Sequence, residues 1–228
     1  MKPVQIIVIL TTFALMGGAV FMAMNKPAFE GVKATSENLQ DTPRHPVTDE
    51  MRARAEAKEG ELAPEIDLPS TTDKNIQLSS LIEQKPVVVV MTKDGCPCSI
   101  EVQPHYTEIA KAYAGEVTFL GVIDGNLQTA ENFKHDFEVP YEFVYTEELD
   151  TFKLFDAKQS VYTYLIAKGG NIIKIWPGYS KGSLKQLNTM IAKELGQEPA
   201  DLPFEMAPEE MTSGCFFFMP IGTDEPAW

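Results

Sequence analysis

The chain has 228 residues and a formal net charge of −14 at pH 7. A strongly acidic protein repels nucleic acid and anionic lipid surfaces, so the composition argues against both kinds of partner. Its three cysteines are too few for a disulfide-stapled scaffold, and their odd number leaves at least one thiol unpaired or shared. The length suffices for one domain of ordinary size with extensions.

The N-terminus contains an apolar stretch long enough to cross a membrane. No charged residue occurs between Pro3 and Met24, and Lys2 precedes the run. Such a run can span the hydrocarbon core as a helix, and positive charge at the extreme N-terminus favours keeping that end in the cytoplasm. We expect an uncleaved transmembrane anchor over residues 1–24, with a cleaved signal peptide as the alternative. The rest of the chain is then expected on the periplasmic or cell-surface side of the membrane.

Residues 25–60 are expected to form a linker, because proline and glycine recur there and apolar residues are few. Within this linker, residues 48–58 have the pattern of a short helix that begins after an N-cap at Thr48. Charged residues dominate this segment, so we expect a solvent-exposed spacer.

Residues 61–196 have the pattern of one α/β domain. Strand-like and helix-like segments alternate, and a hairpin signal at Lys168-Gly169-Gly170 precedes a last helix capped by Ser183. The expected strands are 75–78, 87–91, 117–123, 141–145, 162–167 and 171–176, and the expected helices are 79–82, 100–113, 127–137, 149–155 and 183–195. This order predicts a central mixed β-sheet flanked by helices.

Two cysteines lie where the most apolar strand turns into a helix. Val87–Met91 is a β-branched apolar run, and Cys96-Pro97-Cys98 opens the helical segment that follows. This spacing places Cys96 at the N-cap and Pro97 at the first helical position, where a proline loses no hydrogen bond. Backbone N–H groups and the helix dipole at this end favour a thiolate, so we expect a lowered pKa and thiol redox chemistry. The alternative is that both cysteines are small buried apolar residues.

Five segments in this order resemble the redoxin branch of the thioredoxin-like fold, which includes the alkyl hydroperoxide reductase/thiol-specific antioxidant family and membrane-anchored thiol–disulfide oxidoreductases. They are residues 60–66, 78–81, 85–90, 95–98 and 164–170. The resemblance implies a thioredoxin-like fold and disulfide exchange that begins with attack by the Cys96 thiolate. It also implies a protein or small-molecule disulfide as substrate and a thiol as reductant, and no cofactor is expected.

The cysteine spacing both supports and departs from this family. Pro104 lies eight residues after Cys96, which matches the helix proline of thioredoxins and identifies Cys96 as the attacking cysteine. The second cysteine of the family would fall at Ser99, whereas this chain has Cys98. A Cys-Pro-Cys disulfide closes only a small, strained ring, so Cys98 is expected to be a poor intramolecular partner.

Two further departures concern the surroundings of the cysteines. The cis-proline of the family would fall at Val161 or Tyr162, so the substrate-facing loop is altered, and a non-proline cis bond there would cost about 3 kcal/mol. Peroxidases of the family use an arginine beside the attacking cysteine, and this chain has none after Arg54. These peroxidases also have a threonine three residues before the attacking cysteine, whereas the nearest threonine here, Thr92, lies four residues before Cys96. Peroxide reduction is therefore disfavoured, with Lys93 as a partial substitute for the missing positive charge.

Residues 197–228 form a tail that we expect to pack back onto the domain. The tail contains Gly214-Cys215 followed by three phenylalanines. Some redoxin relatives carry a Gly-Cys pair near the C-terminus, and this resemblance implies that Cys215 can resolve a mixed disulfide at Cys96. Cys98 is the other candidate for that step. The alternative for Cys215 is an apolar plug with no redox role.

A non-catalytic thioredoxin-fold binding module is the competing hypothesis for the whole domain. A copper-carrying relative would combine two cysteines with a distant histidine, for which His135 is the candidate. The cysteine spacing differs from that subfamily, and zinc ligands at finger-like spacing are missing from the sequence. We therefore expect no metal site.

Overall fold

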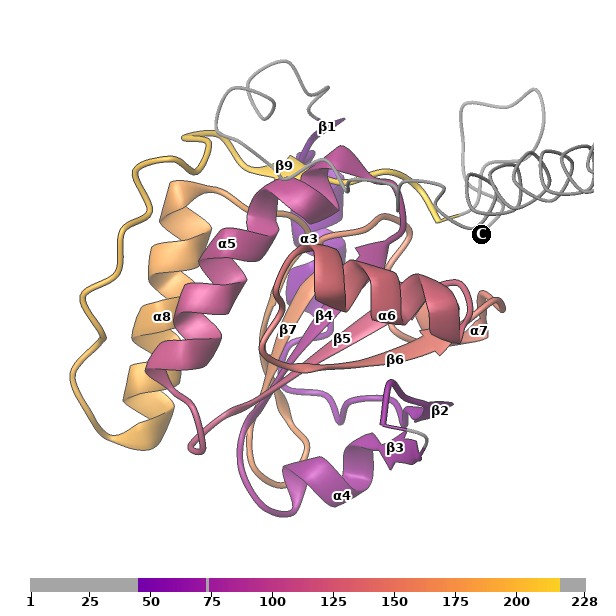
Figure 1. Ribbon diagram of the computed structural model, residues 1–228. Coiled ribbons are helices and arrows are strands. Elements are labelled where there is room, and N and C mark those ends of the chain that lie inside the picture. The colour runs from indigo at the N-terminus through magenta and orange to yellow at the C-terminus, as the bar shows by residue number, and fades with distance from the viewer. Residues whose placement is uncertain (1–44, 73, 218–228) are drawn as a thin grey trace, which may run out of the picture. The chain divides into compact units, whose positions relative to one another are not determined.

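The computed structural model describes residues 45–72 and 74–217 (Figure 1). The expected membrane anchor, residues 25–44 of the expected linker and the tail from Phe218 onward lie outside the described residues. Among the residues that are described, no helix is both long and apolar enough to cross a membrane.

A mixed sheet of five strands, in the order β6-β5-β4-β7-β8, forms the centre of the domain. Strand β4 (Val87–Lys93) pairs in parallel with β5 (Thr118–Asp124), which pairs in parallel with β6 (Glu142–Thr146). On the other side of β4, β7 (Thr163–Ile166) and then β8 (Ile172–Trp176) are added as antiparallel strands. The carboxyl ends of β4, β5 and β6 therefore meet at one edge of the sheet, and the cysteine turn begins there.

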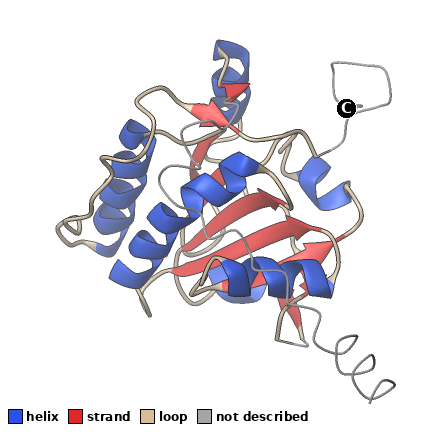
Figure 2. Ribbon diagram, turned by 45° about the horizontal axis from the view of Figure 1, so that its top comes forward, coloured by secondary structure: helices blue, strands red, loops and turns tan. Residues whose placement is uncertain are grey.

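Three helices share one face of the sheet and its hydrophobic core (Figures 1 and 2). They are α5 (Pro97–Ala112), α6 (Leu127–Asp136) and α8 (Lys181–Leu195). Side chains alternate along β4, so Val88 and Val90 belong to this core while their neighbours belong to the core of the opposite face. This alternation explains why β4 is an unbroken apolar run, since both faces of the strand are covered.

The opposite face is covered by shorter elements. Helices α3 (Asp49–Ala57), α4 (Leu78–Ile82) and α7 (Asp150–Leu154) contribute to its core. A small hairpin of β2 (Asp67–Pro69) and β3 (Asn75–Gln77) leads into α4. The α/β class and the mixed sheet are thus confirmed, and the expected strands and helices occur with ends displaced by at most three residues.

Two expectations about the ends of the domain were wrong. Helix α8 begins at Lys181 and is capped by Ser180, whose Oγ accepts a hydrogen bond from the Ser183 N–H at 3.1 Å. Ser183 completes a reciprocal capping box, because its Oγ accepts from the Ser180 N–H at 2.7 Å. The sequence pattern identified the correct residue type but the wrong serine of the pair.

The second error concerns residues 45–60, which are part of the domain and not a free spacer. Thr48 caps α3 as expected, since its side chain accepts from the Met51 N–H. However, Ala55 is buried against the sheet, and Arg54 forms an ion pair with Asp156. The alanine lets the helix approach the sheet closely, which a count of charged residues does not reveal.

The described part of the tail, residues 197–217, packs on the domain. Phe204 and Ala207 are buried, and Phe217 stacks on Phe152 with ring centroids 3.9 Å apart. Strand β9 (Thr212–Ser213) pairs antiparallel with β1 (His45–Pro46). Residues 197–217 are therefore held at several points.

Candidate active site

The turn between β4 and α5 presents Cys96 at the start of the helix. Gly95 has φ +65°, a conformation that suits glycine, and Cys96 is the N-cap with Pro97 at the first helical position. The Oγ of Ser99 accepts a hydrogen bond from the Lys93 N–H at 3.2 Å, which ties the first turn of the helix to the end of the strand. The placement of Cys96 predicted from the sequence is confirmed.

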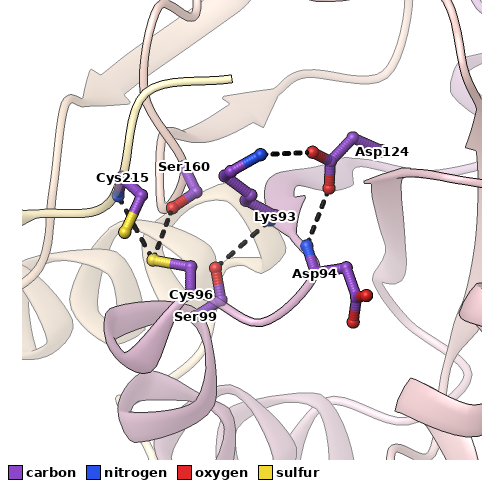
Figure 3. A network of polar contacts seen from close by, with 7 residues as sticks. All are labelled: Lys93, Asp94, Cys96, Ser99, Asp124, Ser160 and Cys215. Atoms are coloured by element: carbon purple, nitrogen blue, oxygen red, sulfur yellow. Dashed lines mark hydrogen bonds and ion pairs between the residues drawn. The ribbon is translucent and has the colours of Figure 1, made fainter. Parts of the chain in front are cut away.

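Hydrogen-bond donors surround the sulfur of Cys96 (Figure 3). The hydroxyl of Ser160 and the backbone N–H of Cys215 each donate to this sulfur over 3.2 Å. A hydrogen bond from the Cys98 thiol is the largest of several effects that lower the pKa of Cys96 to about 4, against the opposing effect of burial. Ser160 and the backbone N–H groups of Cys215 and Ser99 add to the lowering. Cys96 is therefore a thiolate at neutral pH.

Cys98 is suited to donate a hydrogen bond and poorly suited to attack. Its side chain is fully buried. Its hydrogen bond to Cys96, together with burial and the charge of Cys96, raises the pKa of Cys98 well above its ordinary value. Cys98 thus stays a protonated thiol whose hydrogen points at the thiolate of Cys96.

The tail brings Cys215 to Cys96 across 119 positions of the sequence. Cys215 is half-buried, and burial followed by its hydrogen bond to Cys96 raises its pKa to about 12. None of the three cysteines is joined in a disulfide bond in this structure. The structure therefore places all three predicted site residues together at one end of α5.

Ser160 is a site residue that the sequence reasoning missed. It precedes Val161, which has φ +69° and whose N–H donates to the Met91 carbonyl at 2.7 Å. The Met91 N–H in turn donates to the Tyr162 carbonyl at 2.9 Å, so two backbone bonds fix this loop to β4. Peptide bonds are trans throughout the described residues. The predicted position of the family's proline was the available signal, because it marked this loop as the one facing the cysteines.

Lys93 is paired with an acidic side chain beside the cysteine turn. Its amine lies 2.8 Å from a carboxylate oxygen of Asp124, and the other oxygen of Asp124 accepts from the Asp94 N–H at 2.7 Å (Figure 3). Burial raises the pKa of Asp124 above its ordinary value, although the hydrogen bond from Lys93 opposes this. The lysine is thus engaged by Asp124, and its charge lowers the pKa of the neighbouring Cys215 thiol against the larger effect of burial. Its role as a partial substitute for the missing arginine stays a prediction.

The structure gives no support to a copper or zinc site within residues 45–72 and 74–217, where no group of three or more potential ligand side chains is found. His135, the candidate histidine, is 88% exposed near the C-terminal end of α6 and pairs with its neighbour Asp136 at 3.0 Å. Cys96 and Cys98, in contrast, lie at the start of α5, so His135 and these cysteines belong to different helices.

The fold and the site together define a class of protein. A thioredoxin-like domain with a cysteine thiolate at the N-terminus of the helix that follows its central strand is a thiol-dependent oxidoreductase. The chain belongs to the AhpC/TSA family, which matches residues 60–175. No curated protein matches the chain.

Solved structures of similar fold come from several bacteria. An uncharacterized conserved protein from Geobacillus kaustophilus has a TM-score of 0.58 and 15% identity, covering 72% of this chain and 94% of its own. A putative thiol:disulfide interchange protein DsbE from Chlorobium tepidum has a TM-score of 0.56 and 19% identity, over 60% and 98%. Peroxidoxin BcpB from Mycobacterium tuberculosis has a TM-score of 0.53 and 17% identity, over 61% and 97%. At these identities the likeness establishes the thioredoxin-like fold alone.

Proposed function

We propose that this protein is a thiol–disulfide oxidoreductase in which Cys96 is the nucleophile and Cys215 the resolving cysteine. The observation that carries the proposal is the position of Cys215, whose backbone N–H lies 3.2 Å from the Cys96 sulfur. The pKa of about 4 at Cys96 supports the same assignment, because the thiolate is the nucleophile in disulfide exchange.

The reaction proceeds in two exchanges. The Cys96 thiolate attacks one sulfur of a substrate disulfide, the S–S bond breaks, and the departing thiolate takes a proton from water. The Cys215 thiol then loses its proton to solvent and attacks the Cys96 sulfur, which releases the second substrate thiol. Two electrons pass from the Cys96–Cys215 pair to the substrate, and an external dithiol must return them before the next cycle. The same steps run backwards when the pair is oxidised and the substrate is a dithiol.

The surroundings of the two candidates favour Cys215 over Cys98 for the second exchange. A bridge from Cys96 to Cys98 would close a strained ring with one residue between the cysteines. Cys98 is also fully buried, whereas Cys215 is half-buried on a segment at the end of the domain. The long loop closed by a Cys96–Cys215 bridge gives such a disulfide a stabilisation of about 4–5 kcal/mol in the chain-entropy account.

A trapping experiment tests this assignment. The Cys215→Ser variant should accumulate a mixed disulfide between Cys96 and substrate, and the Cys98→Ser variant should turn over without such accumulation. Oxidised wild type should run more compactly than reduced protein on a non-reducing gel, with a Cys96–Cys215 bridge identified after the thiols are trapped. If only a Cys96–Cys98 bridge is mapped and Cys215→Ser turns over as fast as wild type, Cys215 is a buried tail residue and the assignment is wrong.

Peroxide reduction is the alternative activity, and the family and the thiolate are compatible with it. The contacts of Cys96 favour peroxide reduction less than they favour disulfide exchange. Among the hydrogen bonds that the described residues make to the Cys96 sulfur, none comes from a lysine or an arginine. Consumption of hydrogen peroxide with a dithiol reductant, measured beside the reduction of a protein disulfide, distinguishes the two activities.

We further propose that the domain is anchored to a membrane on the extracytoplasmic side. The support is the uncharged run from Pro3 to Met24 after Lys2. Alkaline carbonate should leave the full-length protein in the membrane fraction, and a protease added outside the cytoplasmic membrane should digest the domain. Release by carbonate would contradict the anchor, and a mature N-terminus near Asn25 would show a cleaved signal peptide.

A further inference from the structure

The tail covers the sulfur that must react. Cys96 is only 1% exposed, although its thiolate is the nucleophile of the proposed function. The segment over it is Gly214-Cys215, held beside the Ser160 loop (Figure 3). A substrate disulfide can therefore reach Cys96 only after this segment moves.

The tail binds the loop as an added strand binds a sheet edge. The Gly214 N–H donates to the Ser160 carbonyl at 3.0 Å, and the Ser160 N–H donates to the Cys215 carbonyl at 2.9 Å. Further along, the Phe217 N–H donates to the Lys158 carbonyl at 3.1 Å, and Gln159 forms an antiparallel bridge with Phe216. Hydrogen bonds between backbones do not depend on the side chains, so another extended peptide can make the same bonds once the tail leaves.

We propose that residues 158–160 form the binding edge for an extended substrate peptide, and that the tail occupies this edge as a built-in competitor. This inference rests on the proposed function, since the peptide must carry a cysteine in a disulfide. The peptide would place its cysteine where Cys215 lies, within reach of Cys96. Cys96 then attacks the sulfur of that cysteine, the peptide's disulfide breaks, and its former partner leaves as a thiolate that takes a proton from water.

The position before the cysteine selects glycine. A Cβ built on Gly214 would overlap the Oγ of Ser160 and would lie 3.0 Å from both the Cβ and the carbonyl oxygen of that serine. Ser160 cannot easily turn away, because it is fully buried and its hydroxyl is bonded to the Cys96 sulfur. The need for glycine is one of space, and it applies to any peptide in the same register.

The second position after the cysteine selects an aromatic or large apolar residue. Phe217 is 7% exposed, and its ring stacks on Phe152 at 3.9 Å with an interplanar angle of 24°. The substrate class is therefore an extended peptide with the pattern Gly-Cys-X-aromatic. The protein's own tail is one member of that class.

The test uses the full-length chain in a Cys215→Ser background, so that mixed disulfides persist. The probes are the peptides Ser-Gly-Cys-Phe-Phe and Ser-Ala-Cys-Phe-Phe, each joined through its cysteine to a chromogenic aromatic thiol whose release is followed by absorbance. We expect the glycine peptide to react at least about tenfold faster, since overlap at a packed site is costly. A chromogenic disulfide without a peptide measures the intrinsic reactivity of Cys96.

The competitor role is tested by weakening the tail. Gly214→Ala should speed the reaction with the peptide-free disulfide by about tenfold, because the tail then uncovers Cys96 more often. Phe217→Ala should act in the same direction by removing the stacking on Phe152. Gly182→Ala is the matched control, since a Cβ there would meet its nearest neighbour at an ordinary 3.7 Å.

The outcomes separate this inference from the proposed function. Equal rates for the two peptides would refute the peptide edge, and unchanged rates in both tail variants would refute the competitor role. In either case a rapid reaction of Cys96 with the peptide-free disulfide leaves the proposed function standing. If Cys96 reacts with none of the disulfides in any variant, the proposed function itself fails.

Discussion

Replacing Ser160 with alanine removes one hydroxyl donor from the Cys96 thiolate and leaves the rest of the site in place. The bond spans 3.2 Å, and both residues are buried. A hydrogen bond to a charged group contributes about 1.5–3 kcal/mol, and 1.36 kcal/mol corresponds to one pKa unit. The Ser160→Ala variant should therefore raise the pKa of Cys96 from about 4 to about 5 or 6.

The assay is a pH titration of thiolate ultraviolet absorbance in the reduced protein. Wild type should keep the Cys96 thiolate from neutral pH down to about 5 and lose it as the pH falls through about 4. Ser160→Ala should lose the same absorbance at a higher pH. Ser213→Ala is the matched control, because this buried serine contacts the Ser160 carbonyl at 3.5 Å and has no hydrogen bond to the sulfur.

Stability supplies an independent check with a definite sign. The pKa of Cys96 is lower in the folded protein than its ordinary 9.0, so the thiolate contributes stability that is fully present above pH 9 and is lost as the pH falls towards 4. Ser160→Ala should therefore destabilise the fold by about 1.5–3 kcal/mol in alkali and by less in acid. An unchanged titration midpoint, together with a loss of stability that does not vary with pH, would refute the role of Ser160 as a donor to the thiolate.

Substitutions at three other positions test different parts of the structure. Cys98→Ala should raise the pKa of Cys96, and Cys98→Ser should keep that pKa close to its wild-type value because the serine hydroxyl can donate in place of the thiol. Both variants should retain disulfide exchange. Loss of exchange in Cys98→Ser would make Cys98 the resolving cysteine. Val161→Pro should lower the free energy of unfolding, measured by urea denaturation, by about 2–3 kcal/mol or more. The reason is that Val161 has φ +69°, which proline cannot adopt, and that its N–H is hydrogen-bonded. A urea midpoint equal to that of wild type would contradict this. Gly121→Ala should cost about 1–3 kcal/mol in the same assay, because its Cβ would overlap the buried ring of Phe143, and a neutral effect would show that the ring can move aside.

The elements and the reactive cysteine follow from local physics and could be predicted from the sequence. The run Val87–Met91 is apolar at every position because both faces of β4 are covered, and this pattern is visible in the chain itself. Cys96 is the N-cap because Pro97 is favoured only at the start of a helix. The lowered pKa at a helix N-terminus was expected for the same local reason.

The partners of Cys96 were decided only by the tertiary structure. Ser160 and Cys215 lie 64 and 119 positions away in the chain, and their donors reach the sulfur because the sheet and the tail bring three segments together. Lys93 was expected near Cys96 from its sequence position, and a partly buried carboxylate on the next strand, Asp124, binds its amine. Helix α3 was expected in solvent because its residues are mostly charged, but Ala55 allows it to dock on the sheet. In each case the deciding contact joins residues that are distant in sequence, and periodicity and spacing along one segment carry no information about such contacts.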